Sequence, residues 1–307
     1  MKKFLYIINP TAGKGRGNKT IQKVRYYCDK NKINYKVSIT KYHKHATEIV
    51  KNENSNFTHI IAVGGDGTAN EVLNGIDFNR KIIFAALQVG TGNDLIKNYN
   101  FPKQINDALS VIHNETKQEI KKIDIGKVTF KNANSNKLKE HLFINNLGIG
   151  FDAYVGYLNM HDKLLKGISS YVLAVFKALI KYKMLECDIL FNDKIFSGKK
   201  LMITIGNGIS SGGGFYLTPN AIIDDELLDI SIFEKLSRFK LLKVLPKALL
   251  NKLETVSEAK MYKSKRVEIK LKEPYFMHCD GEVISNNVTS ATVKCLPSAL
   301  KIITGKK

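Results

Sequence analysis

The chain has 307 residues, of which 44% are hydrophobic, so it is long enough for two domains that each have a core of their own. The formal net charge of +20 favours an anionic partner such as a nucleotide, a nucleic acid or an acidic membrane surface, although a solvated basic surface explains it equally well. The four cysteines are widely spaced and form no CxxC pair, which argues against a zinc site or a disulfide framework and favours a reducing cytosol.

No segment of the sequence is apolar for long enough to predict a membrane span. The N-terminal apolar run, Phe4 to Ile8, has five residues, which is too short for the core of a signal peptide. The most apolar helical stretch, Ile168 to Ile180, contains Lys177 and is shorter than the roughly 20 residues that a span requires. We therefore expect any membrane contact to be peripheral.

The first 125 or so residues alternate short apolar runs with helical patterns, which is typical of a parallel sheet covered by helices. Strands are predicted at Phe4–Ile8, Tyr35–Ile39, His59–Val63 and Ile82–Leu87. The first, third and fourth lead directly into turn-forming residues, as expected where the ends of strands carry loops over a ligand crevice.

From about residue 124 the pattern changes to alternating apolar segments with Gly or Asn turns, which predicts a β-sandwich-like second domain. Its strands are expected at Ile123–Phe130, Leu142–Asn146, Cys187–Phe191, Leu201–Ile205, Leu228–Phe233, Arg266–Leu271 and Thr292–Leu296. Helices are expected at Lys163–Lys183 and Ser237–Ser257, and Pro246 should kink or divide the second of them.

The glycine-rich run Gly64–Thr68 (GGDGT) follows the third predicted strand and opens a helical pattern. Glycines let backbone N–H groups approach a phosphate closely, and the helix N-terminus adds positive potential. A tight strand-to-helix turn is the simpler alternative, but three glycines around an acid and before a threonine exceed what a turn requires. The run therefore predicts a phosphate-binding loop.

Two further loops follow neighbouring strands. Gly90–Asp94 (GTGND) follows the fourth strand, and Asn9–Lys14 follows the first, with Lys14 available for a phosphate. The second of these is not a P-loop, because the GxxxxGK[ST] spacing is missing. Since loops after parallel strands lie side by side, we expect these two to share one crevice with the GGDGT run.

Two acidic groups lie further along the chain. Asp280 and Glu282 flank Gly281, which allows either a catalytic base with an electrostatic partner or a simple Asp-Gly hairpin turn. Asp224-Asp225-Glu226 offers oxygen ligands that suit Mg²⁺, but a solvated turn explains it equally well.

Taken in order, these motifs resemble the diacylglycerol kinase catalytic family in its soluble bacterial form, which is similar to the sphingosine and ceramide kinases. The resemblance covers nearly the whole chain and rests on Asn9-Pro10, Gly13, the run from Gly64 to Gly75, the GTGND loop, Asp124-Ile125-Gly126, Gly150–Ala153, Gly212–Ala221 and Asp280-Gly281-Glu282. The GGDGT core alone is shared with NAD kinases and resembles that of phosphofructokinases, whereas the downstream DGE separates the lipid kinases.

The resemblance implies a phosphofructokinase/NAD-kinase-like α/β domain at residues 1–125 and a β-sandwich-like, lipid-acceptor domain at residues 126–297, with residues 298–307 returning to the first domain and the active site between the two. The implied activity is ATP-dependent phosphorylation of the primary hydroxyl of diacylglycerol, or a related lipid, to give phosphatidic acid. The alternative is an NAD kinase-like phosphotransferase. Phosphatidylglycerol, sphingoid bases and isoprenoid alcohols remain open as acceptors.

By the same resemblance, Asp280 would be the general base, with Glu282 as the second candidate. ATP would lie against Asn9, Pro10, Thr11, Ala12, Gly13, Thr40, Gly65, Asp66, Gly67, Thr68, Ala69, Asn70, Glu71 and Thr91.

The resemblance also implies two magnesium sites. One Mg²⁺ at the nucleotide phosphates would be held, partly through water, by Asp66, Asp94 and Asp124, with Lys14 and Lys97 adding positive charge. A structural Mg²⁺ would be held by Asp225 and by main-chain carbonyls near Ile222 and Leu227. The sequence departs from the family at Glu226, where the usual motif has glycine, and at Gln88, where a proline is often found.

A lipid substrate at a membrane surface implies a cytoplasmic protein peripheral to the inner face of the membrane, and the family resemblance implies a homodimer. The two predicted helices are basic and amphipathic, so each could lie on an anionic surface or pack on the β domain. No recognised nucleic-acid-binding motif is present, so we expect no nucleic-acid partner.

Overall fold

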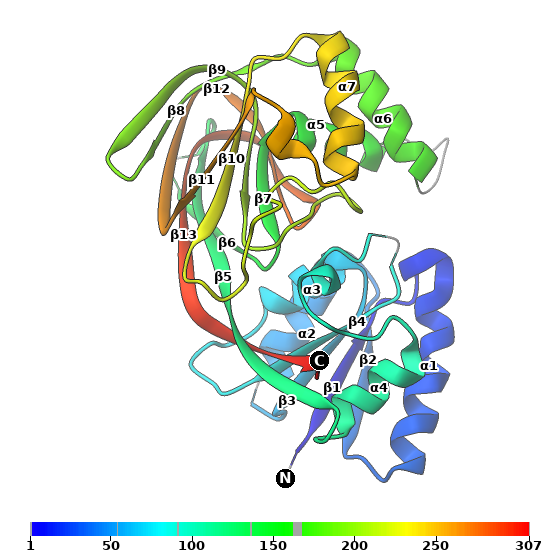
Figure 1. Cartoon of the computed structure of the whole chain (residues 1–307). Coiled ribbons are helices and arrows are strands. Elements are labelled where there is room, and N and C mark those ends of the chain that lie inside the picture. Colours follow the sequence, from blue (N-terminus) through cyan, green and yellow to red (C-terminus); the bar gives the residue numbers. More distant parts are fainter. Residues whose placement is uncertain (1, 54, 91, 136, 162–167, 307) are drawn as a thin grey trace. The chain divides into compact units, whose positions relative to one another are not determined.

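The computed structural model describes residues 2–53, 55–90, 92–135, 137–161 and 168–306. The chain forms two compact units, which are described separately: unit 1 comprises Met1–Asp124 and Pro297–Lys307, and unit 2 comprises Ile125–Leu296 (Figure 1).

Unit 1 is an α/β unit built on a parallel sheet with the strand order β4-β3-β1-β2 (Figure 1). The last part of the chain adds a further parallel strand segment beside β4, where Lys301 pairs with Ile83. The elements that begin in this unit are β1 Phe4–Ile8, α1 Ala12–Lys30, β2 Tyr35–Ile39, α2 His45–Glu53, β3 His59–Gly64, α3 Asp66–Leu73, β4 Ile83–Gln88, the 3₁₀ helix η1 Leu95–Asn98, α4 Ile105–His113 and β5 Gln118–Asn132.

The helices of unit 1 cover both faces of its sheet. On one face, Tyr6 and Ile8 of β1 pack with Val24 of α1 and Leu109 of α4. The chain moves outward from β1 to β2 but returns past β1 to reach β3, so right-handed crossovers place α2 on the opposite face from α1. The central strand β1 is accordingly buried along its whole length.

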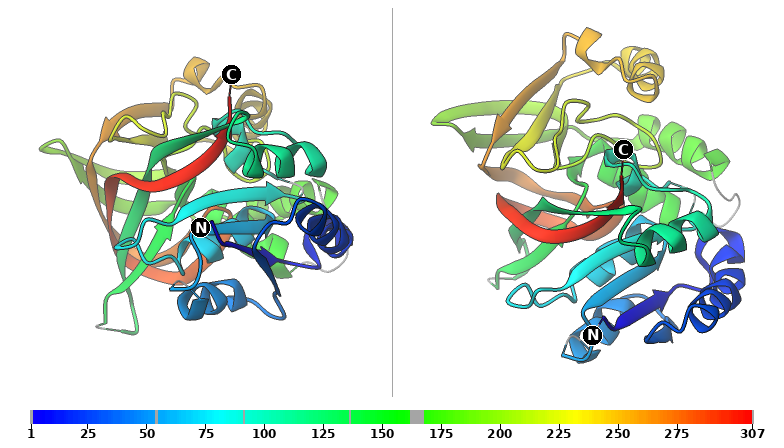
Figure 2. Two further views of the ribbon diagram at one scale, coloured as in Figure 1. Left: turned by 90° about the horizontal axis from the view of Figure 1, so that it is seen from below. Right: turned by 60° about the horizontal axis from the view of Figure 1, so that its bottom comes forward.

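Unit 2 is built mainly from antiparallel strands, several of them long and curved (Figure 2). Strands β9 and β12 each pair with both β7 and β8, which closes the strands around one core. The remaining strands are β6 Lys139–Phe143, β7 Asn146–Gly150, β8 Leu185–Phe191, β9 Lys194–Gly206, β10 Leu228–Glu234, β11 Ala259–Ser264, β12 Arg266–Cys279 and β13 Glu282–Gly305. The predicted combination of an α/β part and a sandwich-like β part is confirmed.

Three helices of unit 2 share a second core with β9 and β10. They are α5 Phe151–His161, α6 Ile168–Lys181 and α7 Arg238–Leu249, followed by the short 3₁₀ helix η2 Leu253–Thr255. Val175 of α6 and Val244 of α7 lie in this core with Phe233 of β10. The helix expected at Ser237–Ser257 is shorter in the structure, because α7 ends at Leu249. Pro246 lies within its last turn and does not divide it.

One predicted strand, Leu142–Asn146, is wrong because it joins two separate strands. β6 ends at Phe143 and β7 begins at Asn146. The backbone N–H groups of Ile144, Asn145 and Asn146 bind a side chain, Asp280, rather than a neighbouring strand.

Candidate active site

In unit 1 the chain adds β2 on one side of β1 and then adds β3 and β4 on the other side, so the strand order reverses between β1 and β3. These two strands are parallel neighbours, and Ile8 is in register with Val63 at their ends. In open parallel sheets, ligands bind at such a switch point, beyond the carboxyl ends of the strands. The loops that follow β1, β3 and β4 meet at this edge, where Asn9 donates its N–H to Val63 and Val89 donates to Gly64. These are the loops that carry the three predicted phosphate-binding motifs.

Glycines allow these loops to approach one another closely. A Cβ on Gly13 would lie 1.8 Å from the Val89 carbonyl oxygen, and a Cβ on Gly90 would lie 2.7 Å from the Cα of Gly65. Gly65 precedes α3, so the free N–H groups of the first turn of α3 open at this point. The arrangement is a backbone cradle at a helix N-terminus, which suits an anion such as a phosphate.

The start of α1 contains a short left-handed segment. Gly13, Lys14 and Gly15 have φ angles of 59°, 60° and 85°. Lys14 is held in a conformation that costs a non-glycine residue about 1–2 kcal/mol, which is common at ligand-binding loops.

Arg16 fixes this segment to the loop after β4. Its guanidinium donates to the carbonyl oxygens of Gly13 at 3.1 Å and Gly90 at 2.8 Å. The role of Arg16 cannot be predicted from the sequence alone, because nothing in its local sequence indicates a partner 74 residues away.

The side chain of Asn9 joins the β1 loop to α3. Its Oδ1 accepts from the N–H and hydroxyl of Thr11, and its Nδ2 donates to Thr68 Oγ1 at 3.3 Å. The N–H of Thr40 donates to the Ile8 carbonyl, so the loop after β2 begins beside the same strand end. The predicted ATP-binding residues from Asn9 to Gly13 and from Gly65 to Asn70 thus lie around one edge of the sheet, whereas Thr91 lies outside the described residues.

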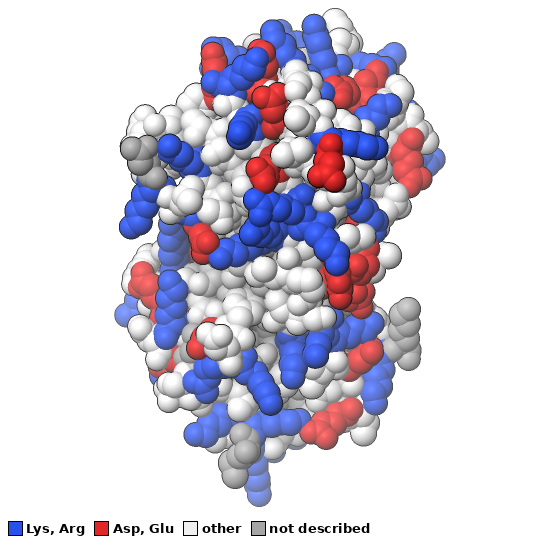
Figure 3. Space-filling view, turned by 90° about the vertical axis from the view of Figure 1, so that its left-hand side faces the viewer, with Lys and Arg blue, Asp and Glu red and all other residues white. Residues whose placement is uncertain are grey.

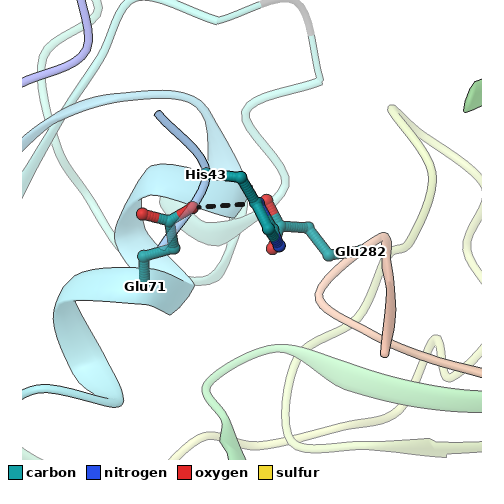
Figure 4. Close-up of side chains that lie close together, drawn as sticks. All are labelled: His43, Glu71 and Glu282. Atoms are coloured by element: carbon teal, nitrogen blue, oxygen red, sulfur yellow. Dashed lines mark ion pairs between the residues drawn. The ribbon is translucent and has the colours of Figure 1, made fainter. Parts of the chain in front are cut away.

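Glu71 has a supporting position. Its carboxylate accepts from the backbone N–H groups of Lys44 at 2.8 Å and Ala46 at 3.2 Å, and it lies 3.3 Å from His43 Nδ1 (Figure 4). Glu71 therefore holds the loop that precedes α2.

Asp66 and Asp94 form a pair of nearby carboxylates beneath the cradle. Asp66 Oδ1 accepts from Gln88 Nε2 at 2.6 Å and from the N–H of Leu95, while Asp94 binds Lys97 at 2.6 Å. Burial, and then the negative charge of Asp94, raise the pKa of Asp66 to about 6. The Gln88 side chain thus supplies a hydrogen bond to this carboxylate.

The oxygen atoms on this segment are of the kind that binds a hard divalent cation. Besides the two carboxylates, Asn93 Oδ1 is buried and has no hydrogen-bond partner within the described part of the chain. Oxygen ligands of this kind suit Mg²⁺, and a cation would offset the repulsion between Asp66 and Asp94. Lys97 already balances one of the charges, so its role is to pair with Asp94.

Asp124 is placed differently from the other two predicted magnesium ligands. Its side chain is fully buried, and Oδ1 accepts from the N–H of Ser298 at 2.7 Å, where the chain returns to unit 1. Among the described residues, neither Asp124 nor the pair Asp66 and Asp94 belongs to a group of three or more acidic, His or Cys side chains close enough to share an ion directly; Asp124 differs from that pair in its bond to the returning chain. This geometry favours a structural role for Asp124.

In unit 2, Asp280 and Gly281 are the two-residue turn between β12 and β13, with φ angles of 49° and 83°. The left-handed turn matches the Asp-Gly preference of tight hairpins. The buried carboxylate of Asp280 accepts three backbone hydrogen bonds of 2.8–2.9 Å, from Ile144, Asn145 and Asn146. These occupy most of its acceptor positions, so Asp280 is a structural anchor.

The same segment anchors the glycine-rich loop after β9. Asn146 Nδ2 donates to the Ser210 carbonyl at 2.7 Å, and Ser211 Oγ donates to Asn146 Oδ1 at 3.0 Å. The Asn145 side chain also donates to Ser210. This network is not visible in the sequence, because its partners are more than 60 residues apart.

Glu282 follows the turn at the start of β13 and is less buried than Asp280. The turn is supported by His278, whose Nε2 lies 3.2 Å from Asp152 Oδ2 while its Nδ1 accepts from the N–H of Gly281 at 3.4 Å. Gly148 leaves room for the pair, because a Cβ there would lie 2.1 Å from the Asp152 carboxylate. The turn that presents Glu282 is therefore fixed on two sides.

The residues of the predicted structural magnesium site do not fit a divalent cation. Lys263 Nζ lies 2.7 Å from Asp225 Oδ2 and 3.3 Å from Asp229 Oδ2, and Lys263 is paired with Asp229 across β10 and β11. Burial lowers the pKa of Lys263, but hydrogen bonds and charge from the two aspartates outweigh it and raise the pKa above its ordinary value. The ammonium group already supplies the positive charge that a metal ion would bring.

The loop at Glu226 contains a residue in the left-handed conformation. Glu226 has a φ of 62°, the left-handed conformation that a glycine adopts most readily. Its carboxylate lies 3.2 Å from Lys265 Nζ, and Leu227 donates its N–H to Asp225 Oδ1. The substitution of glycine is therefore accommodated with local strain, and the predicted ligand Ile222 is exposed.

Comparisons with known proteins agree with this two-part organisation. Residues 3–128 match the diacylglycerol kinase catalytic domain, and residues 145–304 match the YegS C-terminal NAD kinase beta sandwich-like domain.

Relatives include a diacylglycerol kinase of Staphylococcus saprophyticus, 29% identical over 76% of this chain and 73% of its own length. A YegS-like lipid kinase of Yersinia pestis is 31% identical over 76% of this chain and 75% of its own length.

Solved structures show the same fold. A diacylglycerol kinase from Bacillus anthracis has a TM-score of 0.74 at 23% identity, covering 98% of this chain and 96% of its own. Yeast NADH kinase has a TM-score of 0.55 at 9% identity, covering 100% of this chain and 84% of its own. With both family models and the relatives in agreement, the chain belongs to the family of lipid kinases that combine a diacylglycerol kinase catalytic domain with a YegS-type C-terminal domain.

Proposed function

We propose that the protein is an ATP-dependent lipid kinase that phosphorylates the primary hydroxyl of diacylglycerol, or of a related lipid, to give phosphatidic acid. The observation that carries the proposal is the glycine-lined backbone cradle at the switch point of the unit 1 sheet, in a chain of this family. Phosphoryl transfer depends mostly on positioning and on balancing negative charge, which is what such a cradle supplies.

The residues of unit 1 bind ATP in this proposal. The N–H groups at the start of α3 receive the phosphates, and Lys14 adds a positive charge. Asn9 and Arg16 keep the loops closed, because each binds a neighbouring loop directly. Glu71 contributes by holding the loop before α2.

Asp66 and Asp94, with Asn93 Oδ1, are the proposed magnesium ligands. Mg²⁺ bound there would neutralise charge on the nucleotide phosphates. Asp66 must be ionised to hold a cation, so we expect the affinity for Mg²⁺ to fall as the pH drops below about 6, where the carboxylate of the metal-free protein takes up a proton. Asp124 and the Asp225 loop have no place in this site.

We propose Glu282, rather than Asp280, as the proton acceptor. Deprotonating the lipid hydroxyl requires a carboxylate oxygen that can accept a proton at the reacting atom. Three backbone hydrogen bonds engage the buried carboxylate of Asp280, whereas Glu282 is partly exposed on a supported turn. The acceptor oxygen attacks the γ-phosphorus of ATP, its proton passes to Glu282, and ADP leaves.

The test is a kinase assay with γ-labelled ATP and a panel of acceptors in mixed micelles. The panel contains diacylglycerol, phosphatidylglycerol, a sphingoid base, an isoprenoid alcohol and NAD⁺, and products are separated by chromatography. Label in phosphatidic acid supports the proposal. Label in NADP⁺ alone would favour the NAD kinase-like alternative, which is included because the fold resembles that of NADH kinase.

A further inference from the structure

Helices α6 and α7 of unit 2 expose large apolar side chains. Phe239 is 82% exposed, Ile180 is 69% exposed, and Phe176, Leu242 and Leu249 are also exposed. The opposite sides of the same helices pack into the core through residues such as Val175 and Val244. These exposed side chains are therefore additional to those that hold the helices on the sheet. We call the exposed apolar side chains, together with the basic side chains of α6 and α7, the helix-pair surface.

One end of each helix lies close to the other helix (Figure 1). The guanidinium of Arg238, at the start of α7, donates to the carbonyl oxygen of Ile180, near the end of α6, at 3.0 Å. This bond brings the end of α6 beside the start of α7, so that Ile180 and Phe239 belong to one continuous area.

All charged residues of both helices are basic. They are Lys177, Lys181, Arg238, Lys240, Lys243 and Lys247, and neither helix contains an aspartate or a glutamate. On the faces of the molecule that Figure 3 displays, by contrast, acidic side chains are interspersed among the basic ones. Lys240 pairs with Glu258, which lies outside the two helices, and the other five cations give the helix-pair surface a basic character beside its exposed apolar groups.

We propose that the helix-pair surface docks the protein onto an anionic lipid bilayer. Exposed Phe239 and Ile180 enter the boundary between headgroups and acyl chains, while the lysines and Arg238 remain at the level of the lipid phosphates. Juxtaposed basic residues gain free energy from an anionic leaflet. No helix in the described part of the chain is long and apolar enough to cross a membrane, so docking of this kind is superficial.

The proposal rests on the proposed function, because a lipid kinase must reach an acceptor that resides in a bilayer. The other occupant to be tested is a second copy of this chain, which would bury the apolar side chains in a homodimer. Charge distinguishes the two, because a pair of copies related by symmetry would bring like charges together, whereas an anionic bilayer complements them.

Vesicle co-sedimentation of the full chain tests the proposal, with vesicles of phosphatidylcholine alone or mixed with phosphatidylglycerol. We expect binding to the anionic vesicles and little to the neutral ones. Phe239→Ala should weaken that binding about tenfold, and Lys243→Gln about fivefold.

Matched controls lie on α1 of unit 1. Tyr26 is 70% exposed, and Lys23 is exposed on the same helix. Tyr26→Ala and Lys23→Gln should leave vesicle binding unchanged. Circular dichroism and thermal unfolding establish that each variant is folded.

Equal binding to neutral and anionic vesicles, or no vesicle binding, would overturn the proposal. It would also be overturned if Phe239→Ala converted a dimer into a monomer, measured by light scattering, and left vesicle binding unchanged.

Activity assays with dissolved and vesicle-bound diacylglycerol distinguish a wrong assignment of the docking surface from a wrong assignment of the kinase function. Phe239→Ala should keep its activity on a short-chain diacylglycerol dissolved as monomers and lose activity on diacylglycerol in vesicles. If the wild-type protein binds anionic vesicles but phosphorylates no lipid in either form, the proposed function fails and the surface assignment stands.

Discussion

Replacing Asp66 with asparagine separates stability from activity. The pKa of Asp66 is raised from 3.8 to about 6, mainly by burial. Because this pKa is higher in the folded than in the unfolded chain, the ionised carboxylate destabilises the folded state above pH 6, and this effect vanishes below pH 4. A shift of about two units corresponds to about 3 kcal/mol, which we reduce to about 1–3 kcal/mol for partial solvent exposure.

Asparagine keeps an oxygen that can accept from Gln88 and Leu95, so it removes the charge and retains the hydrogen bonds. In EDTA, we expect Asp66→Asn to raise the Tm at pH 8, by roughly 3 °C per kcal/mol, and to leave it unchanged at pH 4. Magnesium-dependent activity should be lost. Asp107→Asn, at an exposed carboxylate of α4, is the control and should give no gain at either pH. A lower Tm for Asp66→Asn at pH 8, or an equal shift at both pH values, would refute the reasoning.

Four further substitutions test other parts of the site. Glu282→Gln should slow phosphoryl transfer by about 10²–10⁴-fold at an unchanged Tm. Asp280→Asn should destabilise the protein by about 2–4 kcal/mol in a denaturant titration, because an amide oxygen cannot accept hydrogen bonds from the same three N–H groups. If Asp280→Asn instead slowed phosphoryl transfer at unchanged stability and Glu282→Gln destabilised the protein, Asp280 would be the base. In the Asp66→Asn background, which lacks the magnesium site proposed at the cradle, EDTA should leave the Tm unchanged, whereas adding Lys263→Met should lower the free energy of unfolding by about 1–2 kcal/mol and make the Tm respond to Mg²⁺; a Tm of Asp66→Asn that falls in EDTA would indicate a structural ion at the Asp225 loop. Glu71→Gln should raise the KM for ATP about tenfold with a smaller effect on kcat, measured in steady-state kinetics, and an unchanged KM would remove Glu71 from the ATP site.

The strands of unit 1 could be predicted closely because each is specified by residues that are adjacent in the sequence. Strands β1, β3 and β4 are short apolar runs that lead into turn-forming residues, so the run and its ending are both visible in the sequence. The predicted strands at Phe4–Ile8 and Tyr35–Ile39 coincide with β1 and β2. The strand predicted at Leu142–Asn146 failed because the carboxylate that interrupts it, on Asp280, lies about 135 residues further along the chain.

The glycine loops of the candidate site were predicted for the same reason, since a close backbone approach leaves a visible pattern of glycines. The roles of individual side chains were less accessible. Arg16 binds Gly90, and Lys263 stands between Asp225 and Asp229, through contacts that only the folded chain creates. A motif identifies an acid, but its partners decide whether that acid binds an ion, anchors a loop or accepts a proton.

The most direct test of the central claim is the transfer of labelled phosphate from ATP to diacylglycerol in mixed micelles by the purified protein with Mg²⁺. Glu282→Gln serves as the matched, folded control. The account predicts labelled phosphatidic acid from the wild type and little or none from the variant. Equal labelling by both proteins would contradict the assignment of Glu282, and the absence of label from every lipid would contradict the proposed lipid kinase activity.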